Sequence, residues 1–240
     1  MKIIIAKDYE EMSAKAFGVM KEVVENNPCA VLGLATGTTP LGLYRNMTED
    51  RQKNGTSYAK IRTANLDEYK GLTKDHPQSY AYFMRENLFR YLDVLPENTN
   101  IENGTAQDEQ AECARYNQLL EEMPRDIQLL GLGSNGHIAS NEPNSPFGSE
   151  THVVSLAEST VKDNARLFAD IGEVPRKAFT MGIKQIMQAK QILILASGAN
   201  KADAVYKTVC GKVTEEVPAS VLQLHPNCIL IADKEAASKL

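Results

Sequence analysis

Cysteine is scarce in this 240-residue chain, and none of its cysteines stands at a metal-binding spacing. The four cysteines lie far apart, at positions 29, 113, 210 and 228, and no CxxC pair occurs. This excludes the usual zinc and dithiol redox motifs. Four scattered cysteines are typical of a reducing compartment. We therefore expect a cytoplasmic protein without a metal site or a redox centre.

Long apolar runs are also missing from the sequence. No stretch approaches the roughly 18 apolar residues of a membrane-spanning helix. The apolar run near the start, residues 3–6, is far too short for a signal peptide and instead predicts a strand. We expect no membrane partner.

Positive charge is not in excess. The chain holds 26 Lys and Arg against 31 Asp and Glu, a net charge of −5, with a sequence pI near 5.5. Nucleic-acid binders normally show a strongly basic face, so we expect no nucleic-acid partner. A local pair of cations can still hold a phosphate on an acidic protein.

The sequence does contain a regular alternation of short apolar runs and longer amphipathic stretches. Strands are predicted at 3–6, 30–34, 61–66, 127–130, 153–156, 192–196 and 228–232. Helices are predicted at 8–26, 40–54, 78–91, 108–123, 200–209 and 234–240, and a short one ends at 185–188. This order predicts an α/β fold with a mostly parallel central sheet covered on both faces. No repeat or linker interrupts it, so we expect one domain over residues 1–240.

The first candidate site follows the second predicted strand. Thr36, Gly37, Thr38 and Thr39 precede a predicted helix that begins with a capping Thr39 and Pro40. Gly37 permits a tight turn, and hydroxyls beside free helix N–H groups form a phosphate cradle. A well-capped helix start with no ligand explains the same residues equally well. No Gly-Lys-Ser/Thr follows, so this is no Walker A loop.

The second candidate site is the acidic pair Asp67 and Glu68, just after the third predicted strand. Ligands of open parallel sheets bind beyond the carboxyl ends of the strands. A carboxylate there can abstract a carbon-bound proton from a substrate. Alone, the pair is also explained by a solvated acidic turn.

The third candidate site is a glycine-rich loop after the strand at 127–130. It contains a formal G-x-G-x-x-G at Gly131, Gly133 and Gly136, but Pro143 interrupts the place where a dinucleotide-binding helix would run. The loop carries His137 five residues before a glutamate. A nearby carboxylate raises the pKa of a histidine and orients its ring. We expect proton transfer here rather than a surface histidine bonded to its own loop.

Together these segments resemble the glucosamine-6-phosphate deaminase family, also called glucosamine-6-phosphate isomerase. Five stretches match in the family's order: LATGTTPLGLY at 34–44, NLDEYKG at 65–71, HPQSY at 76–80, GLGSNGHIASNEP at 131–143 and LQLHP at 222–226. The resemblance implies a modified Rossmann-like three-layer sandwich without a cofactor. It also implies isomerisation and deamination of glucosamine 6-phosphate to fructose 6-phosphate and ammonia, in amino-sugar catabolism.

Roles carry over where the motifs match. Asp67 resembles the base that moves the C2 proton to C1, and His137 the group that opens the sugar ring. Glu142 is similar to the partner of that histidine, and Asn135 stands where members carry Asp or Asn in the same relay. The segment 36–39 matches the phosphate loop, and the two phosphate cations that the resemblance implies are Arg166 and Lys201. Arg166 falls in an irregular stretch, 157–175, expected to be a flap over the site.

Departures from the family pattern affect the pocket and its regulation. Ser140 stands where many members have Phe, and Asn144 and Pro146 replace small residues after it. Allosteric members carry basic residues just past this loop, whereas 151–155 here has no Arg or Lys. We therefore expect a monomer without activation by N-acetylglucosamine 6-phosphate. The alternatives are a 6-phosphogluconolactonase with a similar histidine loop and a sugar-phosphate sensor without catalysis.

Overall fold

The core of the protein is a seven-stranded parallel sheet. The computed structural model describes residues 1–156, 168 and 170–240. The strand order is β1 (Lys2–Ala6), β10 (Cys228–Asp233), β9 (Ile192–Ala196), β6 (Ile127–Gly131), β2 (Val31–Leu34), β3 (Arg62–Asn65) and β5 (Thr99–Asn100), and every neighbouring pair is parallel. The inner strands β2 and β9 are buried along their whole length. Strands buried on both faces are continuously apolar, as the sequence predicted.

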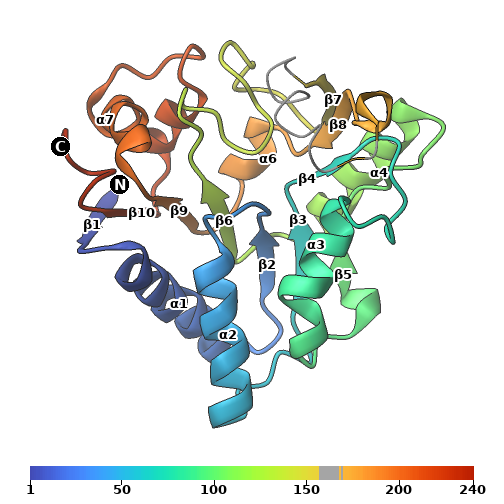
Figure 1. Cartoon of the computed structure of the whole chain (residues 1–240), viewed down its shortest axis with the longest axis horizontal. Coiled ribbons are helices and arrows are strands. Elements are labelled where there is room, and N and C mark those ends of the chain that lie inside the picture. The colour runs from blue at the N-terminus through green and yellow to red at the C-terminus, as the bar shows by residue number, and fades with distance from the viewer. Residues whose placement is uncertain (157–167, 169) are drawn as a thin grey trace.

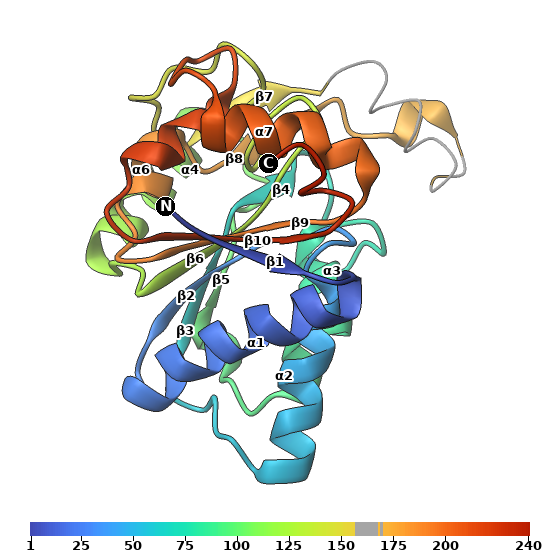
Figure 2. The ribbon, with the colours of Figure 1, turned by 90° about the vertical axis from the view of Figure 1, so that its left-hand side faces the viewer.

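Helices cover both faces of this sheet, which gives three layers. Figure 2 shows α1 (Tyr9–Asn26) and α2 (Leu41–Asn54) below the sheet, with α6 (Ile183–Met187) and α7 (Ala202–Cys210) above it. Helix α1 packs against β9, β10 and α2. Asp8 caps α1 by accepting from the Glu11 N–H, and Met12, Ala16 and Met20 form its buried stripe. The predicted three-layer α/β architecture is confirmed.

Two helices flank the end of the sheet near β3 and β5 (Figure 1). Asp108 caps α4 (Glu109–Glu122) as predicted, accepting from two helix N–H groups. The helix predicted at 78–91 is shorter: α3 spans Tyr80–Asn87, and a 3₁₀ turn follows at Phe89–Tyr91. Leu88 breaks the helix with φ −144° and ψ −64°, and its side chain is buried in the core.

A second, smaller sheet was missed by the sequence prediction. It is antiparallel and has the order β4 (Asp67–Tyr69), β8 (Lys177–Thr180) and β7 (His152–Ser155), at the upper right of Figure 1. Of these strands only β7 was predicted, because three or four residues carry little periodicity and the pairing partners are distant in sequence. Asp67, expected in a loop, begins β4 opposite Thr180.

The helix predicted at 234–240 is wrong; these residues form successive turns. Asp233 ends β10 and its side chain accepts from the Ala236 N–H, at 2.8 Å. Its carbonyl accepts from the Ala237 N–H, at 2.9 Å. Only Ala236 and Ala237 of these seven residues are buried, so a helix here would have little packing to stabilise it.

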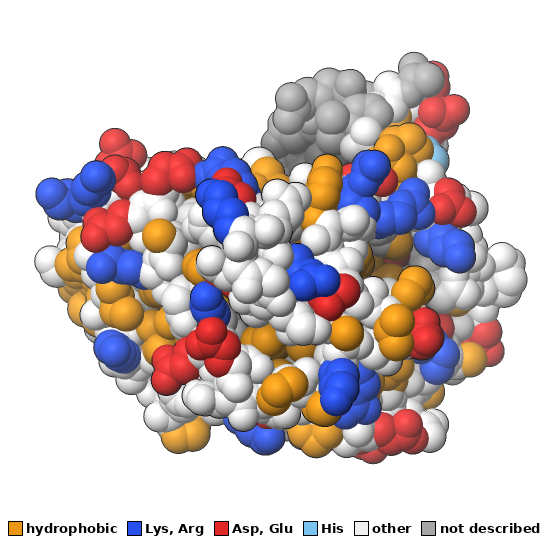
Figure 3. All heavy atoms as spheres, turned by 90° about the horizontal axis from the view of Figure 1, so that it is seen from below, with side chains coloured by type: hydrophobic (Ala, Val, Ile, Leu, Met, Phe, Trp, Pro, Cys, Tyr) orange, Lys and Arg blue, Asp and Glu red, His pale blue; other side chains and the backbone are white. Residues whose placement is uncertain are grey.

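Short 3₁₀ turns supply the remaining connections: η2 (Pro96–Asn98), η3 (Ile171–Glu173), η4 (Ala199–Lys201) and η5 (Pro218–Leu224). No helix within residues 1–156 and 170–240 is both long and apolar enough to cross a membrane. The face drawn in Figure 3 mixes acidic and basic side chains, with apolar ones between them.

Candidate active site

One cavity of about 600 Å³ opens where four neighbouring strands end. Strands β9, β6, β2 and β3 are adjacent in the sheet, and their carboxyl ends meet at one edge. The residues that line the cavity include the segment Thr36–Thr39, Asp67, His137, Ser140, Glu142 and Lys201. The structure therefore brings together predicted site residues from all three candidate loops and from the turn after β9.

The loop after β2 presents hydroxyl groups to this cavity. Gly37 has φ +94°, a backbone conformation that favours glycine. Among the residues that the structure describes, the hydroxyls of Thr36, Thr38 and Thr39 have no hydrogen-bond partner. Free hydroxyls before a helix N-terminus can bind a phosphate.

The start of α2 differs from the prediction that Thr39 caps it. The helix begins at Leu41, and Pro40 before it makes no side-chain cap. Tyr9 of α1 supplies the cap instead, because its hydroxyl accepts from the Gly42 N–H at 2.8 Å. The same hydroxyl donates to the carbonyls of Thr38 and Thr39 at 3.0 and 3.1 Å. Tyr9 thus fixes the loop backbone from a helix 30 residues away, so sequence analysis had no local signal for it.

Asp67 is a buried carboxylate at the cavity wall, with 8% of its surface exposed. The Ser140 hydroxyl donates to Asp67 Oδ2 at 2.8 Å. Burial raises the pKa of Asp67 to about 6, and the Ser140 hydrogen bond opposes that rise. A carboxylate with this pKa is ionised at neutral pH and can accept a proton there.

Glu68, the other half of the acidic pair, has a structural role. Its side chain is 2% exposed and accepts from the N–H groups of Tyr69, Tyr80 and Ala81 at 2.7 to 2.9 Å. Burial raises the pKa of Glu68 to about 7 in spite of these hydrogen bonds. The carboxylate therefore holds the N-terminus of α3 against β4. The alternative explanation of the pair as a solvated acidic turn is therefore wrong, because both carboxylates are buried.

The glycine-rich loop after β6 positions an imidazole through two polar partners. Asn135 Oδ1 lies 2.8 Å from His137 Nδ1, and Asn135 Nδ2 donates to Glu142 Oε2 at 2.6 Å. A Cβ on Gly133 would lie 2.3 Å from His137 Nδ1, so only glycine leaves room for the ring. The three polar residues predicted as a relay are in contact.

This chain of contacts decides the tautomer of His137. The amide of Asn135 donates through Nδ2 to Glu142, so its Oδ1 faces His137 as an acceptor. Nδ1 of His137 must then carry the hydrogen, and Nε2 of the neutral ring is the atom free to accept a proton.

The pKa of His137 shifts opposite to the prediction. Burial lowers the pKa below its usual value, Lys201 lowers it further, and the Glu142 carboxylate opposes both. Glu142 is half exposed and 3.4 Å from Nδ1, so solvent weakens its effect. The carboxylate orients the ring, but desolvation dominates its pKa.

Lys201 is presented to the cavity by a turn after β9. Gly198 starts this turn with φ +92°, and the Lys201 N–H closes it onto the Gly198 carbonyl. Asp233 of β10 accepts from the Ser197 hydroxyl at 2.5 Å and from the Gly198 N–H at 3.0 Å. Burial lowers the pKa of Lys201. Asp233 is a supporting residue that sequence analysis missed.

Two predictions fall outside the described residues. Arg166, the second expected phosphate cation, lies there, as does most of the expected flap at 157–175.

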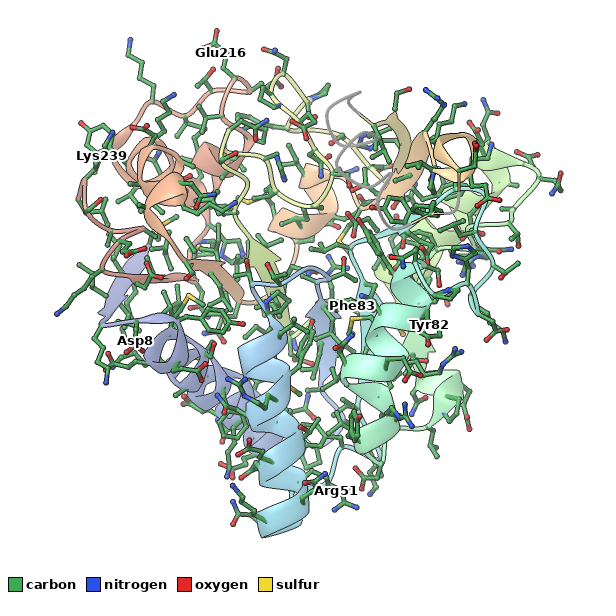
Figure 4. All side chains as sticks on the ribbon, viewed as in Figure 1. Asp8, Arg51, Tyr82, Phe83, Glu216 and Lys239 are labelled. Carbon is green, nitrogen blue, oxygen red and sulfur yellow. The ribbon has the colours of Figure 1, made fainter. Side chains whose placement is uncertain are left out.

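The aromatic residues of α3 are a further wall of the cavity that sequence analysis missed. Tyr80 and Phe83 line the cavity, and the Tyr80 ring lies 4.5 Å from that of Tyr69. In Figure 4, Phe83 and Tyr82 point to opposite sides of α3. Within the described part of the chain, no group of three or more His, Cys, Asp or Glu side chains is placed to hold a metal.

Comparison with known proteins places the chain in a family. A sequence model described as glucosamine-6-phosphate isomerases/6-phosphogluconolactonase matches residues 7–230. The chain belongs to this family. The resemblance drawn from five sequence motifs is thereby confirmed.

Family relatives match over nearly their full length. A glucosamine-6-phosphate deaminase of Geobacillus sp. (strain WCH70) is 52% identical over 239 residues, which are 99% of this chain and 95% of the relative. A glucosamine-6-phosphate deaminase of Clostridium novyi (strain NT) is 50% identical, and the match covers all of both chains.

Solved structures from the family share the fold. A monomeric glucosamine-6-phosphate deaminase is 47% identical, with a TM-score of 0.96 over the whole of both chains. A 6-phosphogluconolactonase from Trypanosoma brucei is 21% identical, with a TM-score of 0.80, and the match covers 100% of this chain and 98% of that one. At that identity the second likeness shows the fold alone.

Proposed function

We propose that the protein isomerises and deaminates glucosamine 6-phosphate, giving fructose 6-phosphate and ammonia, in amino-sugar catabolism. One observation carries the proposal: a buried carboxylate, a histidine relay and a cradle of hydroxyls with a cation line the same cavity. The relatives named as glucosamine-6-phosphate deaminases, about 50% identical over their whole length, support this substrate over other sugar phosphates.

Phosphate binding positions the sugar. The free hydroxyls of segment 36–39 and the Lys201 ammonium form one anion-binding wall. Binding energy from a group remote from the reacting carbons orients them against the acid–base groups. We propose that Arg166 adds the second cation, as in the family motif.

His137 opens the ring. Its neutral Nε2 accepts the proton of the C1 hydroxyl, and the imidazolium returns that proton to the ring oxygen as the C1–O5 bond breaks. The relay through Asn135 to Glu142 stabilises the imidazolium while it exists.

Asp67 then moves a proton between carbons. Its carboxylate removes the proton from C2 while the aldehyde oxygen O1 takes up a proton that the C2 ammonium gives up, which forms an enolamine. Asp67 then returns its proton to C1, which leaves an imine at C2. Water adds to the imine carbon, the C–N bond breaks, and ammonia leaves with the ketone of fructose 6-phosphate. One water is consumed for each ammonia released, so the reaction is a hydrolytic deamination.

We further propose that the protein is a cytoplasmic monomer with one domain, not activated by N-acetylglucosamine 6-phosphate. The solved relative that is a monomer supports the monomeric state. One apolar core that runs from Ala6 to Ala237 supports a single domain. Four free cysteines are typical of a reducing compartment. The absence of Arg and Lys from 151–155 supports the lack of activation.

Two parallel assays test the activity. Ammonia release from glucosamine 6-phosphate is measured beside acid release from 6-phosphogluconolactone, with Asp67→Asn as the inactive control. We expect ammonia from the wild type and little from the variant. Faster lactone hydrolysis than ammonia release would assign the rival activity, and tight sugar-phosphate binding without either product would indicate a sensor.

A further inference from the structure

The base of the proposed reaction has one side-chain hydrogen-bond donor, Ser140. Ser140 Oγ donates to Asp67 Oδ2 at 2.8 Å. Within the described part of the chain, no other side chain donates to this carboxylate. A buried carboxylate with a single hydrogen bond depends on that bond for its orientation.

The backbone around Ser140 is fixed on both sides. The Ser140 N–H donates to Thr180 Oγ1 at 3.1 Å. The next residue, Asn141, is fully buried, and its amide donates to the carbonyls of Ile138 and Met181 at 3.1 and 2.9 Å. Ser140 is therefore tied to β8 and the residue after it.

Asp67 is tied to the same two residues. Asp67 pairs with Thr180 in the second sheet, and the Met181 N–H donates to the Leu66 carbonyl at 2.7 Å. Thr180 and Met181 thus hold both ends of the Ser140–Asp67 hydrogen bond. Ala139, just before the serine, has φ +51°, a left-handed conformation that is unusual for a residue with a Cβ. Such a conformation persists only where the surroundings hold it.

We propose that Ser140 is the positioning residue of the base. Its hydroxyl holds Oδ2 of Asp67 and leaves Oδ1 as the atom that takes the C2 proton. This inference rests on the proposed function, which supplies the proton to be moved. It goes beyond it, because the reaction as proposed assigns no role to Ser140.

The same hydrogen bond adjusts the acidity of the base. A donor to a carboxylate stabilises its charged form and so lowers its pKa. Burial alone would raise the pKa of Asp67 further than the value near 6 that it has beside Ser140. The hydroxyl therefore keeps more of the base ionised at neutral pH.

Carboxyl carbon NMR titration tests the proposal without turnover. Asp67 is assigned from the signal that Asp67→Asn removes, and its pKa is compared in wild type, Ser140→Ala and Ser140→Thr. Removal of one hydrogen bond to the charged form is expected to raise the pKa by about 0.5–1 unit in Ser140→Ala. Ser140→Thr keeps the hydroxyl and should keep the wild-type pKa. An unmoved pKa in Ser140→Ala, or the same rise in both variants, overturns the proposal.

Kinetics give the matching readout. In Ser140→Ala the acid limb of kcat/KM should move to higher pH by the same amount, and kcat should fall roughly tenfold because the base is less well oriented. Ser57→Ala is the control: it removes a hydroxyl that donates to the carboxylate of Asp93, away from the cavity, and the acid limb should stay in place. A wild type that releases no ammonia defeats the proposed function alone, since the titration still reports on the Ser140 contact.

Discussion

Asp67 and His137 face one cavity but are held in different ways. Asp67 is almost fully buried, belongs to a sheet and has a neutral hydroxyl partner. The His137 side chain is about one-third exposed, sits in a glycine-rich loop and reaches a carboxylate through an amide. Burial raises the pKa of Asp67 and lowers that of His137. The same physical cause thus favours the uncharged form of each group: it moves the pKa of Asp67 closer to neutral pH and keeps His137 a neutral proton acceptor there.

The comparison teaches that exposure to water decides what controls the pKa of each group and how strongly a charged neighbour acts on it. Desolvation governs the pKa of Asp67, because its site is buried and its hydrogen-bond partner is uncharged. The exposed Glu142 carboxylate has a screened influence on His137, so its effect should be small.

Loss of the buried base should have the largest effect. Asp67→Asn keeps the size of the side chain but cannot accept the C2 proton, so ammonia release should fall by about 10³-fold or more. The dissociation constant of fructose 6-phosphate, measured by calorimetry, should stay within about threefold. Turnover near the wild-type rate would show that another group is the base.

Loss of the imidazole should cost less. His137→Gln removes the group that opens the ring, and we expect kcat to fall about 10²-fold. The loss is smaller because sugar rings also open in water without a catalyst. Steady-state ammonia assays on both variants give the ratio of the two losses in kcat. A His137→Gln defect larger than that of Asp67→Asn would reverse the contrast drawn here.

The pH profile should report the buried carboxylate. Asp67 must be ionised to act, and its pKa is near 6, so kcat/KM should fall about tenfold per pH unit below about pH 6. Activity is expected to be level between about pH 7 and 8. An acid limb near pH 4, the range of an exposed aspartate, would contradict the desolvation of Asp67.

Loss of the exposed carboxylate should have a small effect. Glu142→Gln keeps a hydrogen-bond acceptor for Asn135 but removes the charge that opposes the lowering of the His137 pKa. We expect a loss of about three- to tenfold in kcat and a further drop in the His137 pKa by proton NMR. A loss as large as that of His137→Gln would mean that solvent does not screen this carboxylate.

Stability should change least, and with a sign set by linkage. The folded-state pKa of Asp67 is raised to about 6 from 3.8, so the folded protein binds the proton more tightly and stability declines as pH rises between these values. Above pH 6 the buried charge costs about 3 kcal/mol. Asp67→Asn should therefore raise Tm by about 6–12 °C at pH 8 and by much less at pH 4.5. Equal shifts at both pH values in thermal melts would argue against a charged, buried Asp67.

The sequence by itself determined the layer architecture and the location of the site. Continuous apolar strands such as β9 and the buried stripe of α1 carry their periodicity locally, and polar residues after parallel strands must meet at one edge. The loops with Gly37 and Gly133 could also be predicted from the sequence, since close backbone turns need glycine.

Only the tertiary structure decided which groups support the site and how their pKa values shift. Tyr9, Asp233 and Ser140 reach their partners from segments some 30 to 73 residues away, and the strands that hold Asp67 and Thr180 are too short to show a pattern. The direction of the His137 shift was mispredicted because desolvation depends on what surrounds the ring in space. Burial is a property of the packed chain, and no local run of residues encodes it.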